Sequence, residues 1–89
     1  MRFAWDGREA DLNARKHGVT FEEAATVFSD PLALIIEDEA HPGNARIIGE
    51  SAASRILLVV FIERGRDVLR LISARRATRH ERRRYEEGE

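Results

Sequence analysis

The sequence predicts an α+β fold with the element order β-α-α-β-β-β-β-α. Capping signals mark the starts of two helices in the first third of the chain, and a third capping signal follows the last strand segment. Between them, short apolar segments alternate with turn residues, which is typical of strands. We therefore expect an antiparallel sheet packed on two N-terminal helices, followed by a C-terminal helix, in a single domain over residues 1–89.

A short strand and a first helix begin the chain. Arg2–Trp5 has its two aromatic residues on one face of an extended segment. Asp6 and Glu9 form a capping box that starts the helix. Gly18 ends it, because glycine tolerates the left-handed conformation found after helix C-termini.

A second helix follows directly. Thr20 and Glu23 form its capping box. Pro31 ends the segment, because the residue before a proline is pushed out of the helical region. Apolar residues recur at the i, i+3, i+4, i+7 spacing of one buried helix face, namely Phe21, Ala24, Ala25 and Phe28.

Four strands occupy the rest of the predicted sheet. Leu32–Ile36 and Arg46–Glu50 are separated by turn residues. Arg55–Arg64 contains an unbroken apolar run, which predicts a central strand buried on both faces. A hairpin turn leads into Val68–Arg75, so the last three strands should form an antiparallel meander. We expect the two N-terminal helices to cover one face and leave the other partly open.

Composition excludes several classes of protein. The chain has no cysteine, so disulfides and thiolate metal sites are excluded. It has no apolar run approaching the ~18 residues needed to span a bilayer, and its first six residues do not resemble the long apolar segment of a secretory signal. We expect a cytoplasmic protein that uses no cofactor.

The basic residues are concentrated near the C-terminus, although the net charge is −1. Seven of the 15 Lys and Arg residues lie between Arg70 and Arg84. A third capping box, Thr78 with Glu81, places this cluster across the end of a strand and the start of a helix. Cations in this arrangement indicate a site for a polyanion. The codon preference of a GC-rich genome accounts for the arginine content equally well.

The residue types suit one reaction, the cleavage of RNA by its own 2′-hydroxyl. The chain has no glycine-rich phosphate loop, and its three histidines lack metal-ligand spacing. Cleavage through the 2′-hydroxyl requires a base, an acid and fixed cations for the charge of the phosphorane. We expect Arg46 and Arg75 to project from the same exposed face, where they would hold the phosphate.

Five segments occur in order along nearly the whole chain: Phe3-x-Trp5-Asp6, Lys16–Ala25, Val27–Pro31, Arg46–Gly49, and Ile72–Thr78 followed by Glu81, Tyr85 and Glu86. Together they resemble the BrnT family, toxins of type II toxin–antitoxin systems. The resemblance implies a RelE-like fold and a metal-independent endoribonuclease that arrests growth by cutting RNA. It also implies a hetero-oligomer with a BrnA-type ribbon-helix-helix antitoxin, which blocks the toxin and binds operator DNA.

The resemblance identifies candidate site residues but does not assign their roles, which we give as hypotheses. The positions that match polar residues of the family motifs are Lys16, His17, Arg46, Arg75 and Tyr85. We expect the two arginines to clamp the phosphate and Lys16 or His17 to contribute from the first helix. His80 or Tyr85 would donate a proton from the last helix. The predicted RNA contacts are Arg76, Arg79, Arg82 and Arg83. The arginines of the last helix, Arg84 included, would otherwise bind acidic residues of the antitoxin.

Each role has a structural alternative. The two first-helix residues also complement the helix dipole at a C-terminus. The two arginines could instead pair across strands with Glu50 or Glu63, which stabilises little when exposed. The chain also departs from the family pattern, since Asn44-Ala45 stand where relatives often have a glutamate. If that glutamate is a base, Glu50 or a histidine must replace it. The alternative function is a non-catalytic basic module that binds nucleic acid or an acidic protein.

Overall fold

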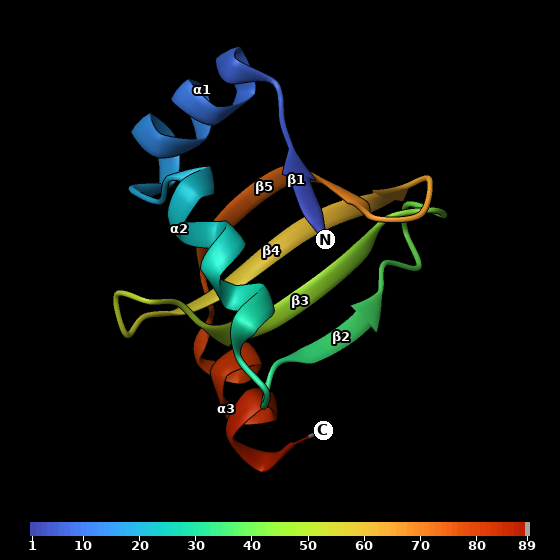
Figure 1. The fold of residues 1–89 in the computed structure, drawn as a ribbon. Coiled ribbons are helices and arrows are strands. Elements are labelled where there is room, and N and C mark those ends of the chain that lie inside the picture. The colour runs from blue at the N-terminus through green and yellow to red at the C-terminus, as the bar shows by residue number, and fades with distance from the viewer. Residues whose placement is uncertain (89) are drawn as a thin grey trace.

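The computed structural model describes residues 1–88, which form one five-stranded sheet with three α-helices and a 3-10 turn (Figure 1). The α+β class and the element order match the prediction. None of the described helices has the length and apolar character required to span a membrane. The elements are β1 (Arg2–Ala4), α1 (Gly7–His17), α2 (Phe21–Thr26), η1 (Val27–Ser29), β2 (Leu34–Glu37), β3 (Ala45–Glu50), β4 (Ile56–Arg64), β5 (Val68–Arg76) and α3 (Arg79–Glu87).

The strands lie in the order β1-β5-β4-β3-β2, so β4 is central, as its apolar run predicts. Strands β2 to β5 form an antiparallel meander. The exception to the expected antiparallel sheet is β1, which pairs parallel with β5 through Phe3 and Leu69. A three-residue strand carries no sequence signal for its direction. Strand β2 starts later than predicted, because the Asp30 side chain accepts a hydrogen bond from the Leu32 backbone and forms a turn there.

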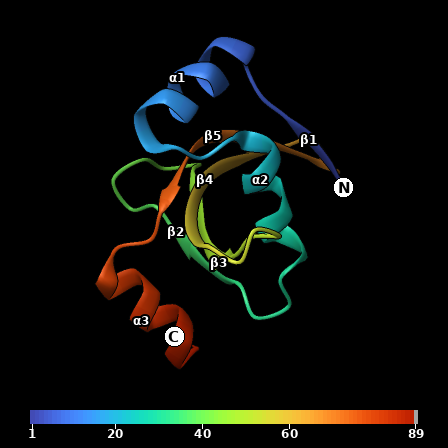
Figure 2. The same ribbon diagram turned by 90° about the vertical axis from the view of Figure 1, so that its left-hand side faces the viewer.

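Helix α2 packs inside the curve of the sheet, and α1 lies beside the outer edge of β5 (Figure 2). Phe21, Leu57 and Leu71 are fully buried between these layers. Phe28 packs edge-on against Phe61, with ring centroids 5.0 Å apart. The prediction that the N-terminal helices cover one face is therefore confirmed for α2, whereas α1 lies beside the outer edge of β5.

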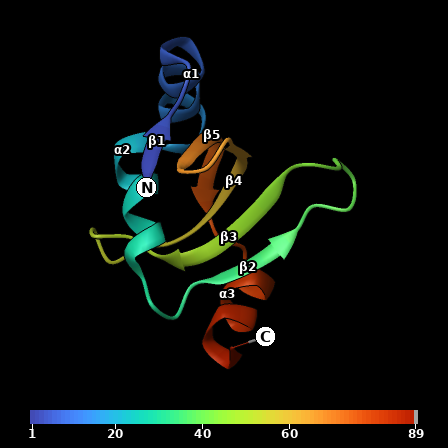
Figure 3. The same ribbon diagram turned by 45° about the vertical axis from the view of Figure 1, so that its right-hand side comes forward.

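Helix α3 lies on the opposite side of the sheet, at one end of it (Figures 2 and 3). There the sheet buries Ile48 completely and Leu58 almost completely. Further along the same face, Val60 and Ile62 are only half-buried. This face is thus partly open, as expected.

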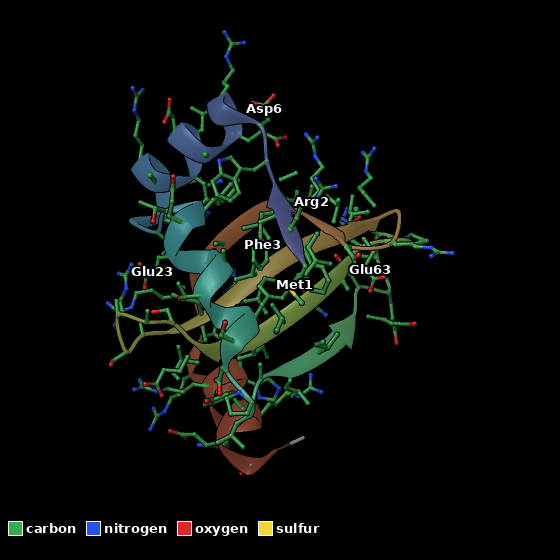
Figure 4. The ribbon with its side chains drawn as sticks, viewed as in Figure 1. Met1, Arg2, Phe3, Asp6, Glu23 and Glu63 are labelled. Atoms are coloured by element: carbon green, nitrogen blue, oxygen red, sulfur yellow. The ribbon has the colours of Figure 1, made fainter. Side chains whose placement is uncertain are left out.

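The three predicted N-caps are present, but only the last forms a complete capping box, because Glu9 pairs with Arg70 at 3.5 Å and Glu23 also has a different partner. Asp6 and Thr20 each accept backbone N–H groups of their helix, and Thr78 forms a complete capping box. The Glu23 carboxylate instead accepts hydrogen bonds from the Arg55 guanidinium, one of them 2.9 Å long. This pairing lowers the pKa of Glu23. Figure 4 shows Glu23 pointing from α2 toward the loop between β3 and β4. The pair with Arg55 joins two charged groups, whereas a capping box would give the carboxylate only a neutral backbone N–H as its partner.

Asn13 is a buried polar residue that the sequence did not single out. Beyond the last β1 pairing, at Arg70, the outer edge of β5 has no strand beside it. Asn13 of α1 takes that place, donating to the Ala74 carbonyl (2.8 Å) and accepting from its N–H (3.0 Å). Its amide also donates to the Val19 carbonyl at 2.9 Å. Asn13 therefore joins α1 to the sheet by bonds that a strand would otherwise make.

Candidate active site

Arg46 and Arg75 project from the same face of the sheet. Arg46 in β3 pairs with Val60, and Arg75 in β5 pairs with Leu58. Val60 and Leu58 are two residues apart in β4 and point the same way, so both arginines do too. From strand spacing and rise, their Cα atoms are about 12 Å apart. The expected common face is confirmed, and we term it the arginine face.

Arg46 carries an uncompensated charge. Its side chain lies between the cross-strand neighbours Ile36 and Val60 and is half-buried. Within residues 1–88, its Nε is buried without a hydrogen-bond partner, and no ion pair involves the residue. The suggested pairing with Glu50 or Glu63 is therefore wrong for Arg46. A partly desolvated cation without a partner is unfavourable, so the position favours binding of an external anion.

Arg75, in contrast, has a partner. Its Nη1 and Nη2 donate to the two carboxylate oxygens of Glu81, at 2.8 and 2.9 Å. Glu81 also accepts from the Thr78 backbone N–H, which completes the cap of α3. The hydrogen bonds from Arg75 lower the pKa of Glu81 from 4.5 to about 2 against the opposing effect of burial. The suggested pairing of Arg75 with Glu50 or Glu63 is thus also wrong, because Arg75 pairs with Glu81.

The Arg75–Glu81 pair predicts an acid-dependent loss of stability. Glu81 has a lower pKa in the folded chain, so its contribution is complete above about pH 4.5 and is lost as the pH falls through about 2. We expect Glu81→Gln to lower the free energy of unfolding by about 1–2 kcal/mol at pH 7, since part of the pair is solvent-screened. Urea unfolding at pH 7, 4 and 2.5 should show the difference from wild type shrinking. A difference that stays constant down to pH 2.5 would contradict the pairing.

Lys16 and His17 lie at the outer edge of β5. They line a cavity of about 220 Å³ together with Ser73. Ser73 pairs with Val60, so it lies on the arginine face in the same cross-strand row as Arg46. The structure therefore brings Arg46, Ser73 and the end of α1 into one band across the sheet.

Tyr85 lies in a different place. Its hydroxyl donates to Asp30 Oδ2 at 2.6 Å, which ties α3 to the segment after η1. The same oxygen accepts from the Glu50 backbone N–H at 2.8 Å. The structure does not join Tyr85 to the band that contains Arg46. His80 is exposed on the first turn of α3, one residue before the Glu81 that holds Arg75.

Tyr85 also yields a spectroscopic prediction. The hydrogen bond to Asp30, assisted by burial, raises the pKa of Tyr85 to about 12. Because it is the chain's one tyrosine, absorbance at alkaline pH reports it alone. We expect a midpoint near 12 in the wild type and a value near 10 in Asp30→Ala. The bond's contribution to stability is present below about pH 10 and is lost as the pH rises through 12. Equal midpoints in the two proteins would contradict the contact.

The four predicted RNA contacts separate into two groups. Arg76 pairs with the buried Leu57, so it points to the face opposite Arg75. Arg76 and Arg82 line one polar cavity. Arg79 and Arg83 are exposed on α3 and do not line this cavity. In the part of the chain that the structure describes, no three His, Asp or Glu side chains are grouped to hold a metal ion.

Comparison with known proteins identifies the family. Residues 5–81 match the family model described as the ribonuclease toxin, BrnT, of type II toxin–antitoxin systems. The chain belongs to the BrnT family. A crystal structure of the Brucella abortus ribonuclease toxin BrnT matches it with a TM-score of 0.73 and 27% sequence identity, covering 89% of this chain and 99% of that chain. A search of curated proteins found no match.

The BrnT fold brings in three residues that motif reasoning missed. Ser73 lies in the same cross-strand row as Arg46. In the sequence, the feature that could have indicated it was a hydroxyl side chain within a mostly apolar strand segment. Glu81 was expected only as a cap, and it also binds Arg75. Asp30, the partner of Tyr85, is 55 residues away in the sequence, and no local pattern connects the two.

Proposed function

We propose that this chain is a single-domain BrnT toxin that acts as a metal-independent endoribonuclease, with its active site on the arginine face. The observation that supports this most directly is the Arg46 guanidinium, which has no ion-pair partner among residues 1–88 and whose buried Nε has no hydrogen-bond partner there. It shares a row with Ser73 and lies on the same face as Arg75. A site with fixed cations and neighbouring proton carriers has the groups that cleavage through the 2′-hydroxyl requires.

Arg46 is the proposed phosphate clamp. Its side chain would bind the non-bridging oxygens of the scissile phosphate and stabilise the extra negative charge of the phosphorane. Arg75 would join it when the incoming phosphate takes the place of the Glu81 carboxylate, since Glu81 occupies both of its terminal nitrogens. Arginine suits this role because its planar fork binds phosphate in a bidentate manner.

Two histidines are the proposed proton carriers. His17 lies beside Lys16 at the edge of β5, and it would accept the proton of the 2′-hydroxyl. The 2′ oxygen then forms a bond to phosphorus, and the bond from phosphorus to the 5′ oxygen breaks. His80 would protonate that leaving oxygen, which gives a 2′,3′-cyclic phosphate and a 5′-hydroxyl. Tyr85 is the weaker candidate for the acid, because its proton is held by Asp30.

The proposed partner is a BrnA-type antitoxin with a ribbon-helix-helix portion. The type II family implies an antitoxin, and the exposed arginines of α3, including Arg79 and Arg83, offer charges for its acidic residues. The complex would bind operator DNA through the antitoxin, and free toxin would cut RNA in the cytoplasm. Growth arrest on expression of the toxin, with recovery when the antitoxin is co-expressed, tests this pairing.

Cleavage by the purified chain tests the enzyme proposal. The toxin, free of antitoxin, is incubated with messenger RNA in EDTA. We expect fragments that end in 2′,3′-cyclic phosphate, and no cleavage of the same RNA carrying 2′-O-methyl groups. Loss of all cleavage in EDTA would contradict metal independence. RNA binding without cleavage under any metal condition would favour the alternative, a non-catalytic binding module.

A further inference from the structure

A second concentration of arginines lies away from the arginine face. It surrounds a polar cavity of about 240 Å³ at the end of the sheet, where the β3–β4 loop, the end of β5 and the start of α3 meet (Figure 1). Three guanidinium groups come from three different segments of the chain. The cavity is lined by Ser54, Arg55, Ile56, Arg76, Ala77 and Arg82.

Arg55 is the fixed member of this cluster. Its Nε and Nη2 bind the Glu23 carboxylate, and Nη2 also donates to the Gly18 carbonyl at 3.1 Å. These bonds hold the guanidinium plane in one orientation. Nη1 is not part of this network, so it can serve a ligand in the cavity.

Arg76 and Arg82 supply charge that the protein does not neutralise closely. Arg76 makes no ion pair within residues 1–88, although its positive charge contributes to lowering the pKa of Glu23. Arg82 is 62% exposed and has Glu86 at 4.0 Å, the limit of an ion pair. A contact of this kind between exposed side chains stabilises little. The cavity is therefore lined by three arginines, and the one carboxylate that is bound tightly to them is Glu23, through Arg55.

The donors around the cavity define the class of ligand. Guanidinium groups only donate hydrogen bonds, and the Ser54 hydroxyl can add another donor. An anion with several oxygens matches such a set, and phosphate, like carboxylate, is bound by arginine in a bidentate manner. Arg76 follows Arg75 directly in β5 but points to the opposite face. An RNA strand that crosses the end of β5 would thus meet both sites.

We propose that the Arg55–Arg76–Arg82 cavity is a second phosphate site, which binds the RNA backbone beside the scissile position. The proposal rests on RNA being the substrate, but it does not require the chain to cleave it. The site would position the strand and would take no part in the chemical step. An acidic segment of the antitoxin is the competing occupant.

The salt dependence of RNA binding tests the site. A single-stranded 2′-O-methyl RNA, which cannot be cleaved through the 2′-hydroxyl, serves as the probe in fluorescence anisotropy. Removing one cation that binds a phosphate lowers the steepness of log K against log salt by about 0.7. We expect this decrease in Arg76→Gln and in Arg82→Gln, about twice as much in the double variant, and a retained slope in Arg76→Lys. Arg55 is left intact because it holds Glu23.

Arg66→Gln is the matched control. Arg66 is exposed in the β4–β5 turn, at the other end of these strands, and its substitution should leave the slope unchanged. Thermal unfolding of every variant checks the fold. Unchanged slopes in both cavity variants overturn the proposal, as does a loss of antitoxin binding with RNA binding intact. If wild type binds RNA without cleaving it and the variants still show the lower slope, the site stands and the ribonuclease proposal fails.

Discussion

Arg46→Met should lower the rate of RNA cleavage by about 100- to 1,000-fold, the usual cost of removing one preorganised group that stabilises transition-state charge. Methionine keeps most of the apolar stem that packs beside Val60, and it removes the buried Nε that has no partner in the described chain. We therefore expect the melting temperature to stay the same or rise. Single-turnover cleavage assays and thermal unfolding of the same samples measure both effects.

Arg64→Met is the control for this substitution. Arg64 is an exposed residue at the end of β4, and its side chain alternates onto the same face as Val60. It should retain wild-type cleavage. Full activity of Arg46→Met would show that Arg46 is not part of the active site, and the proposed phosphate clamp would then be wrong. Arg46→Lys should be intermediate, because lysine keeps the charge but not the bidentate geometry.

Asn13→Ala should destabilise the fold more than any other single polar substitution described above. The change leaves the Ala74 N–H and the Ala74 and Val19 carbonyls without their side-chain partner in a site that is only 7% exposed. An unsatisfied buried group costs about 1–3 kcal/mol, so we expect a total near 3 kcal/mol. For a chain of this size, that corresponds to a melting temperature lower by roughly 12–24 °C.

Asn44→Ala provides the comparison, because Asn44 lies in the turn before β3 and its backbone, not its side chain, makes the turn hydrogen bonds. Its effect should stay within about 0.5 kcal/mol, as for a surface substitution. Chemical denaturation of the two variants in parallel gives the difference. A small effect of Asn13→Ala would mean that the Ala74 N–H and carbonyl find other hydrogen-bond partners.

Local signals predicted most of the fold. The caps at Asp6, Thr20 and Thr78 depend on neighbouring residues, and the apolar run of β4 identifies a central strand whatever its partners are. Features set by distant residues were not predictable in this way. The Glu23 carboxylate matches a capping box, yet Arg55, 32 residues away, binds it instead.

The same distinction applies to the site. The alternation of side chains along a strand was sufficient to predict that Arg46 and Arg75 share a face. It could not indicate that one guanidinium would be paired and the other unpaired, because that depends on where α3 packs. Strand alternation sets the face of Arg76, whereas the surface that Arg79 and Arg83 reach depends on the docked position of α3.

The Arg75–Glu81 pair links the order of α3 to ligand binding. An anion that takes both terminal nitrogens of Arg75 displaces Glu81, and with it the carboxylate that caps the helix. By thermodynamic reciprocity, whatever holds the first turn of α3 in place weakens anion binding at Arg75 by the same factor. Occupation of Arg75 should therefore increase amide hydrogen exchange at the start of α3. Helix α3, through Glu81, thus competes with an anionic ligand for Arg75 of β5.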